Sequence, residues 1–338
     1  MGSDCTRSKG PKIRRQRSRA LPILSAVPES KDERLAEIAE LQAGAVANRQ
    51  LRDAGMSTKD VKVRLRRGSL ALTKARGVYR VAGAERTWRQ DLWVALLAGP
   101  EGSLASHVSA AALRGLMAPP SIPQVTVPRA TSGRFGGAVV HYATIGDADR
   151  ARCDGIQTTG VGRMVVDCAA VLNQKGLNDL VDAAFGKRLC TYREVIAAWE
   201  RAGHVRGGMR LRDALAPYST GAEPGSVAAA GVLRRICEWG FPMPLCEYEI
   251  RDEHGEWVAT VDFFWPAWWF VLEYDGGAAH GPRRRRLDAV RQAALEGIGL
   301  RVERTDRFDA RPSSTRLFDL LCEVFGRPGI QGNTKRSA

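Results

Sequence analysis

The chain has 338 residues, of which 44% are hydrophobic and 26% are charged, which predicts a globular protein of two or three domains. Lys and Arg number 51 against 37 Asp and Glu, so the formal net charge of +14 favours encounters with a polyanion such as nucleic acid. No run of about 18 apolar residues occurs, and residues 1–19 lack the apolar core of a signal peptide, so we expect a cytoplasmic protein without a membrane partner. The seven cysteines are scattered and form no C-x-x-C pair, which argues against a disulfide framework or a zinc site.

Residues 1–30 are expected to form a disordered basic arm. They have too few apolar residues to fold alone. Between residues 7 and 19 there is no acid, and the cations are Arg7, Lys9, Lys12, Arg14, Arg15, Arg17 and Arg19. A general bias toward arginine is the alternative explanation of such charge.

Residues 31–84 have the pattern of a helix-turn-helix. Leu35, Ile38 and Leu41 recur at a three-residue spacing, which gives a first helix one apolar face. A second helix covers residues 48–54 and stops at Gly55. Ser57 and Asp60 then form a capping box that opens a third helix.

The third helix and the following hairpin carry the candidate DNA contacts. Short strands are expected at residues 71–73 and 78–81, joined by a basic turn that acts as a wing. A basic helix fits the major groove, and a basic wing tip can touch the flanking backbone. The predicted DNA-binding residues are Lys59, Lys62, Arg66 and Arg67 on the helix and Lys74 and Arg76 on the turn. A solvated basic face on a small helical domain is the alternative.

The run GAVANRQLRDAGMSTKDVKVRLRRGSLALTKARGVYRVAG resembles the N-terminal winged-helix domain of AbiEi-type antitoxins, the repressor half of type IV toxin-antitoxin systems. The later segments ASHVSAAALRGL, VTVPRA, VVHYA and DGIQTTGVGRMVVDCAAVL extend the resemblance to residue 172. This resemblance implies a DNA-binding regulator with a cognate toxin as a possible partner.

Residues 85–220 are expected to form a mixed helical and strand region without chemistry of its own. Helices are predicted at residues 87–97 and 106–116 and from about residues 162, 177 and 191, with a strand pair at 124–127 and 138–143. His107 and His141 have no acidic or cysteine partner nearby in the sequence, so we interpret both as structural. The region spaces the two ends of the chain and is a candidate for self-association.

Residues 221–325 have the element order αβββαβ, followed by a flexible tail at 326–338. A helix is expected at residues 226–239, strands at 245–251, 256–264 and 269–274, a helix at 285–298 and a last strand at 300–305. The whole chain is therefore predicted to be an α+β multidomain protein.

Three carboxylates lie among the apolar residues of the strands in this last region. Glu273 and Asp275 point to the same face of their strand, because side chains alternate, and Asp262 stands on the neighbouring strand. Converging carboxylates repel one another unless a cation neutralises them, and Mg²⁺ (or Mn²⁺) suits such an oxygen cluster. A metal held by Asp262 and Glu273 could support phosphodiester hydrolysis. The alternative is structural: Asp262 caps a strand, Glu273 pairs with Arg304, and Asp275 makes the turn.

The segment VDFFWPAWWFVLEYDGGAAH, with the RRRRLDAVRQ helix after it, resembles the endonuclease domain related to Vsr, a branch of the PD-(D/E)XK superfamily. The resemblance implies catalytic roles for Asp262, Glu273, Asp275 and His280. It also matches Asp288, Arg291 and Arg304, and it places Ala230 where such domains commonly have a helix glutamate.

Two functions therefore remain open. In the first, the protein is a metal-dependent DNA endonuclease, and Arg283, Arg284, Arg285 and Arg286 hold phosphate. In the second, it is a non-catalytic AbiEi-like transcriptional regulator whose last domain is a further DNA clamp. Both bind double-stranded DNA.

Overall fold

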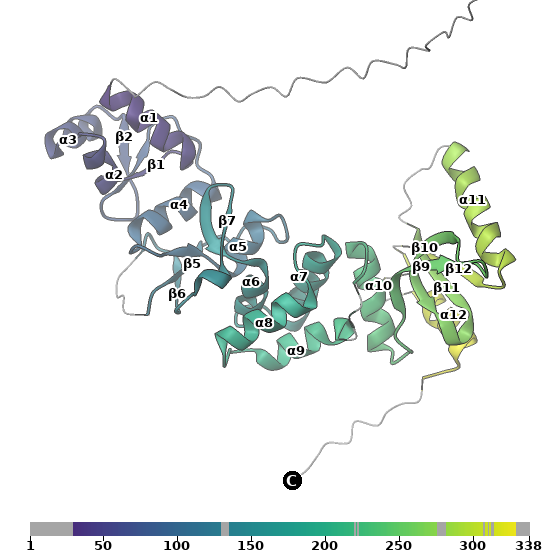
Figure 1. Ribbon diagram of the computed structural model, residues 1–338. Coiled ribbons are helices and arrows are strands. Elements are labelled where there is room, and N and C mark those ends of the chain that lie inside the picture. Colours follow the sequence, from purple (N-terminus) through teal and green to yellow (C-terminus); the bar gives the residue numbers. More distant parts are fainter. Residues whose placement is uncertain are drawn as a thin grey trace, which may run out of the picture.

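The computed structural model describes residues 30–129, 135–219, 221, 223–275, 282–306, 308, 309, 311 and 314–328, with the backbone alone for 282–285. Across these residues the chain is an α+β protein whose three sheets follow one another along an extended arrangement (Figure 1). The predicted basic arm before Ser30 and the tail after residue 328 lie outside the described residues.

The first unit consists of three helices and a three-stranded sheet. Its elements are α1 (Lys31–Leu41), β1 (Ala45–Ala47), α2 (Asn48–Asp53), α3 (Thr58–Arg66), β2 (Leu70–Leu72) and β3 (Val78–Val81). The three helices and the β2–β3 hairpin lie where the sequence predicts them. Strand β1 was not predicted; it is fully buried and pairs antiparallel with β3 in the order β1-β3-β2. Leu35, Leu51 and Val61 bring one apolar side chain from each helix into the core of the unit.

Helix α3 begins at the predicted capping box. The N–H of Asp60 donates to Ser57 Oγ at 3.2 Å, and the N–H of Ser57 donates to Asp60 Oδ2 at 2.9 Å. The Ser57 amide and the Lys31 ammonium, which lies 3.0 Å from Asp60 Oδ2, lower the pKa of Asp60 to about 2. The carboxylate of Asp60 is therefore committed to the start of α3 and to α1.

The middle region combines a five-stranded sheet with helices. Its helices are α4 (Trp88–Ala98), α5 (His107–Leu113), α6 (Val161–Cys168), α7 (Gln174–Gly186), α8 (Tyr192–Ala202) and α9 (Gly208–Leu215). Its strands are β4 (Leu104–Ala105), β5 (Gln124–Val127), β6 (Val139–Tyr142), β7 (Arg150–Cys153) and β8 (Ile156–Thr159), in the order β6-β5-β4-β8-β7. Helices α7, α8 and α9 lie to one side of the sheet (Figure 1). The sequence analysis missed β4, β7, β8 and α9, which are short, and it correctly placed the others.

His107 and His141 lie in this sheet region and stack on each other. Their ring centroids are 3.5 Å apart with an interplanar angle of 15°, and His107 Nδ1 is 2.9 Å from Ser106 Oγ. Burial, together with the neighbouring His141 ring, lowers the pKa of His107 to about 2. Burial also lowers the pKa of His141, so both rings are neutral near pH 7.

The last region is a four-stranded sheet with three helices. Its elements are α10 (Val227–Glu238), β9 (Leu245–Arg251), β10 (Trp257–Trp265), β11 (Phe270–Asp275), α11 (Pro282–Gly297), β12 (Arg301–Asp306) and α12 (Arg316–Phe325). Strands β9, β10 and β11 form an antiparallel meander, and α11 carries the chain to β12, which pairs parallel with β11. This is the predicted order, extended by α12. Leu317 and Leu321 of α12 are buried four residues apart, a helical spacing that the sequence analysis overlooked.

Helix α10 joins the middle region to the last sheet. Arg234 of α10 and Asp182 of α7 are each 7% exposed, and Arg234 Nε lies 2.8 Å from Asp182 Oδ2. Arg234 Nη2 also donates to the carbonyl of Ala214 at 2.9 Å, and the hydroxyl of Tyr218 donates to Asp182 at 2.6 Å. One hydrophobic cluster contains residues of α7, α10, β10 and β11. The core is therefore continuous across residue 220, where the sequence predicts a domain boundary.

Two further observations concern the described residues as a whole. None of their helices combines the length and the apolar character that a membrane crossing requires. The six cysteines among them, Cys153, Cys168, Cys190, Cys237, Cys246 and Cys322, are free thiols.

We predict that Asp182→Asn lowers the free energy of unfolding by about 3–5 kcal/mol, because it leaves the buried Arg234 guanidinium without its counter-charge. Asp179→Asn is the matched control on the same helix. It breaks the exposed pair with Lys175 and should cost less than about 1 kcal/mol. Urea unfolding followed by circular dichroism measures both variants, and equal small losses would contradict the prediction.

We also predict that His107→Asn removes one pH-dependent contribution to stability. Below pH 6.5 the unfolded chain binds a proton at His107, which the folded chain excludes, so the native protein loses stability as the pH falls. Between pH 7.5 and 5.5 this loss is about 1 kcal/mol. Asn tolerates the φ of 52° at this position. Urea unfolding of both proteins at each pH tests this, and a difference between them that does not change with pH would refute it.

Candidate functional site

The predicted DNA contacts of the first unit all lie on its surface. The side chains of Lys59, Lys62, Arg66 and Arg67 on and just after α3, and of Lys74 and Arg76 in the β2–β3 turn, are exposed. Helix α3 lies at the end of the molecule remote from α11 and the last sheet (Figure 1). The basic face formed by these six residues is thus open to a large ligand.

The acids near this face form ion pairs with cations that do not belong to it. Asp60 pairs with Lys31 at 3.0 Å, and Asp32 of α1 pairs with Arg64 of α3 at 2.5 Å. Among the described residues, none of the six cations of the basic face forms an ion pair with an acid. Their charges therefore add to one another and remain available to a polyanion.

A surface depression of about 580 Å³ lies on α3 within the basic face. It is lined by Thr58, Lys59, Lys62, Leu65 and Arg66. Residues 58, 62 and 65 share one side of the helix, because residues three and four apart are neighbours on a helix surface. The depression therefore combines cationic side chains with an apolar one.

Two of the three predicted carboxylates, Asp262 and Glu273, lie in one row across the last sheet. Phe263 pairs with Leu272 and Glu273 pairs with Arg304, so the next position of the β10–β11 register places Asp262 opposite Glu273. The structure therefore brings Asp262 and Glu273 together as the sequence predicts.

Both carboxylates already have protein partners. Asp262 Oδ2 accepts the backbone N–H of Tyr274 at 2.7 Å, and Glu273 Oε1 pairs with the Arg291 guanidinium of α11 at 2.7 Å. Burial raises the pKa of Glu273 to about 7, although Arg291 lowers it, and the charge of Asp262 raises it further. The structural alternative named Arg304 as the partner of Glu273, whereas the ion pair is made by Arg291.

The structure adds a third carboxylate to the row that the sequence analysis missed. Glu247 of β9 lies opposite Asp262, between the register pairs Val261–Tyr248 and Phe263–Cys246. Its φ of 49° is left-handed, a conformation that side-chain alternation along a strand cannot reveal. Burial of the Glu247 carboxyl and the negative charge of Asp262 both raise the pKa of Glu247.

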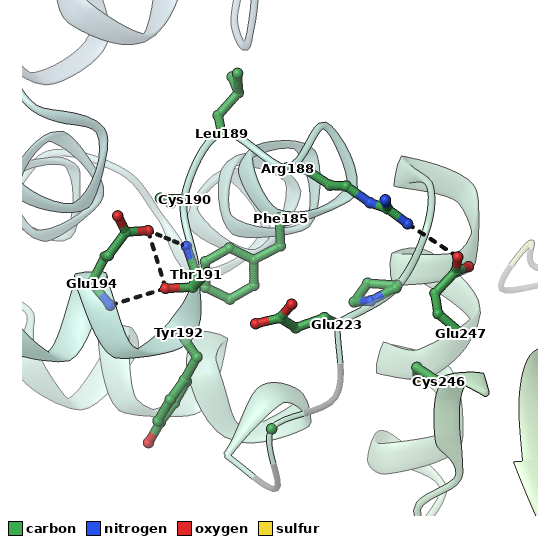
Figure 2. Close-up of a pocket in the computed structure, with 12 residues that line it drawn as sticks. Phe185, Arg188, Leu189, Cys190, Thr191, Tyr192, Glu194, Glu223, Cys246 and Glu247 are labelled. Carbon is green, nitrogen blue, oxygen red and sulfur yellow. Dashed lines mark hydrogen bonds and ion pairs between the residues drawn. The ribbon is translucent and has the colours of Figure 1, made fainter. Parts of the chain in front are cut away.

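Glu247 also forms one wall of a cavity of about 570 Å³ between the middle region and the last sheet. Figure 2 shows Arg188, at the end of α7, reaching across this cavity to Glu247, and the two side chains pair at 3.0 Å. The backbone N–H of Gly225 bonds the same carboxylate. A side chain at residue 225 would collide with Glu247, because a Cβ there would lie 2.0 Å from Oε1. On the opposite wall Glu194 caps α8 through Thr191, as the sequence predicts.

The remaining predicted residues are less closely gathered. Asp275 ends β11 in register with Asp306, Asp288 is half-buried on α11, and Arg286 and Arg304 are exposed. Ala230 is fully buried in α10 and belongs to the core shared with the middle region, so this position offers no carboxylate to the row. His280 lies outside the described residues, as do the side chains of Arg283, Arg284 and Arg285.

The carboxylate row makes protein contacts that compete with a divalent cation. One oxygen of Asp262 accepts the Tyr274 amide, and one oxygen of Glu273 is bound to a guanidinium. Mg²⁺ is usually held by one or two carboxylates together with waters, so these two contacts compete with a metal for the same groups. Within the described part of the chain, no three His, Cys, Asp or Glu side chains are grouped to hold a metal. The arrangement instead neutralises Glu273 with Arg291 and fastens α11 to the sheet.

Comparison with known proteins adds little to this description. No protein-family model matches the chain, and no curated protein matches it. The crystal structure of the RV2827C protein from Mycobacterium tuberculosis is similar over 61% of this chain and 80% of that one, with 16% sequence identity and a TM-score of 0.39. A likeness this distant carries no argument about function.

Proposed function

We propose that this protein binds double-stranded DNA through the basic face of α3 and the β2–β3 turn, as a non-catalytic regulator of the AbiEi-like kind. The observation that carries the proposal is a set of six exposed cations that pair with no acid among the described residues, on a unit of three helices and a hairpin. In the winged-helix interpretation, α3 enters the major groove and the turn contacts the flanking backbone.

Charge and geometry support the proposal together. A helix with its side chains is about as wide as the major groove, so the side of α3 that carries Lys62 and Arg66 can approach base edges and phosphates at once. Arg67, Lys74 and Arg76 extend the positive surface beyond the helix. Contacts of this kind supply affinity that falls steeply with salt.

We predict that Lys62→Glu combined with Arg66→Glu weakens DNA binding by about 100-fold. Each charge reversal replaces an attraction to phosphate by a repulsion and costs about 1.4 kcal/mol of binding free energy, which is a factor of about ten. The plot of log affinity against log salt should also become flatter by about 2, one unit for each lost phosphate contact. Fluorescence anisotropy with a labelled duplex at several salt concentrations measures both quantities.

The matched control changes the net charge equally at another place. Lys175→Glu with Arg193→Glu alters two exposed cations of α7 and α8 in the middle region. This double variant should bind DNA nearly as well as the native protein. Equal weakening by both double variants would show that only the total charge matters, and the proposed contact surface would then be wrong.

A metal-dependent DNA endonuclease is the second candidate. It is favoured by the placement of Asp262 opposite Glu273 on adjacent strands, beside the helix that carries Arg286. The pairing of Glu273 with Arg291 weighs against it, because the carboxylate is already neutralised by the protein. This function would require Arg291 to release Glu273 when DNA arrives.

We predict that supercoiled plasmid stays intact with the native protein in Mg²⁺ or Mn²⁺, while its gel band is retarded. Glu273→Gln and the exposed control Glu249→Gln, prepared identically, should give the same pattern. Nicking that requires the metal, survives in Glu249→Gln and is lost in Glu273→Gln would establish the endonuclease and overturn the non-catalytic proposal.

A further inference from the structure

The depression on α3 differs in character from the rest of the basic face. Lys59, Lys62 and Arg66 place cations on its lining, whereas Leu65 and the methyl group of Thr58 are apolar. Leu65 is half-buried, since one side packs against the core of the first unit that contains Val61. Exposure of an apolar area to water costs free energy, and a ligand that covers the area recovers that free energy.

The ligand that covers this area has to satisfy both kinds of lining. Phosphate oxygens can satisfy Lys59, Lys62 and Arg66, but they would leave Leu65 against a polar surface. In the major groove, the group that is apolar and projects from a base edge is the C5 methyl of thymine. The depression, at about 580 Å³, has room for the edge of a base that carries such a methyl group.

We infer that the α3 depression contacts the C5 methyl group of a thymine through Leu65 and Thr58, while the surrounding cations hold the neighbouring phosphates. This inference rests on the proposed function, because it assumes that α3 lies in the major groove. It adds a source of sequence preference, namely a requirement for thymine, to contacts that otherwise carry no base information.

The test changes the DNA rather than the protein, so folding is unaffected. The full chain first selects bound duplexes from a random-sequence pool, and the best duplex is then synthesised with deoxyuridine in place of each thymidine in turn. At one or two positions, loss of the methyl group should weaken binding about fourfold, and the slope of log affinity against log salt should not change.

A conservative protein variant makes the assignment specific to the depression. Thr58→Ser keeps the hydroxyl and removes the methyl, so it should reduce the preference of the protein for thymine over uracil. Leu41→Ala is the control, because Leu41 is an apolar side chain of the same unit that is 76% exposed on α1. It should leave the preference unchanged.

The outcomes distinguish a failure of the thymine contact from a failure of the proposed DNA binding. If no duplex is bound at all, the proposed function fails. If duplexes are selected but contain no preferred thymine, or if their uracil forms bind equally well, DNA binding stands and the thymine contact is wrong. A preference for thymine that is unaffected by Thr58→Ser also overturns the assignment to this depression.

Discussion

The ion pair between Arg234 and Asp182 is the interaction on which the arrangement of this molecule depends. Both side chains are 7% exposed, so their charges would be very costly inside the protein if either lost its partner. Tyr218 and the carbonyl of Ala214 complete the hydrogen bonding around the pair. Because Arg234 belongs to α10 and Asp182 to α7, the pair fixes the last sheet against the middle helices. The same contact between α7 and α10 places Arg188 where it pairs with Glu247 across the adjoining cavity.

The first unit has a different electrostatic organisation, in which acids and cations are separated by face. Asp32 and Asp60 are held by Arg64 and Lys31, at the contact between α1 and α3. The outward side of α3 is then left with cations that no described acid neutralises, around an apolar depression. A surface of this kind suits a ligand that offers phosphates and an apolar group together, which is what the major groove presents where thymine occurs.

Strands β10 and β11, which carry Asp262 and Glu273, and helix α3 of the basic face lie at opposite ends of the molecule (Figure 1). The row is internally balanced: Asp262 accepts an amide of the adjacent strand, Glu273 pairs with Arg291, and Glu247 pairs with Arg188. Burial raises the pKa of Glu273 to about 7, so its charge varies near neutral pH, and the ion pair to α11 varies with it. In this sheet the carboxylates therefore connect neighbouring elements through hydrogen bonds and ion pairs.

Much of the local structure followed from the sequence, because it depends on interactions between near neighbours. The spacing of Leu35 and Ile38 predicted α1, and the Ser57–Asp60 box predicted the start of α3. Side-chain alternation placed Glu273 on one face of its strand, with Asp262 on the neighbouring strand. Exposure of Lys62 and Arg66 was likewise predictable from the helical period. The strands β4, β7 and β8 were missed, whereas β5 and β6, of four residues each, were placed.

Tertiary structure alone decided which distant groups neutralise one another. The β9–β10 register places Glu247 opposite Asp262, and the packing of α11 on the sheet places Arg291 beside Glu273. Neither follows from a local pattern, because each depends on how strands and helices far apart in the chain are packed. The sequence by itself thus determined most of the elements, the exposure of the basic face and the placement of Asp262 and Glu273 on adjacent strands. Packing decided whether those carboxylates remain available to a cation, since it is the packed neighbours that supply the competing positive charge.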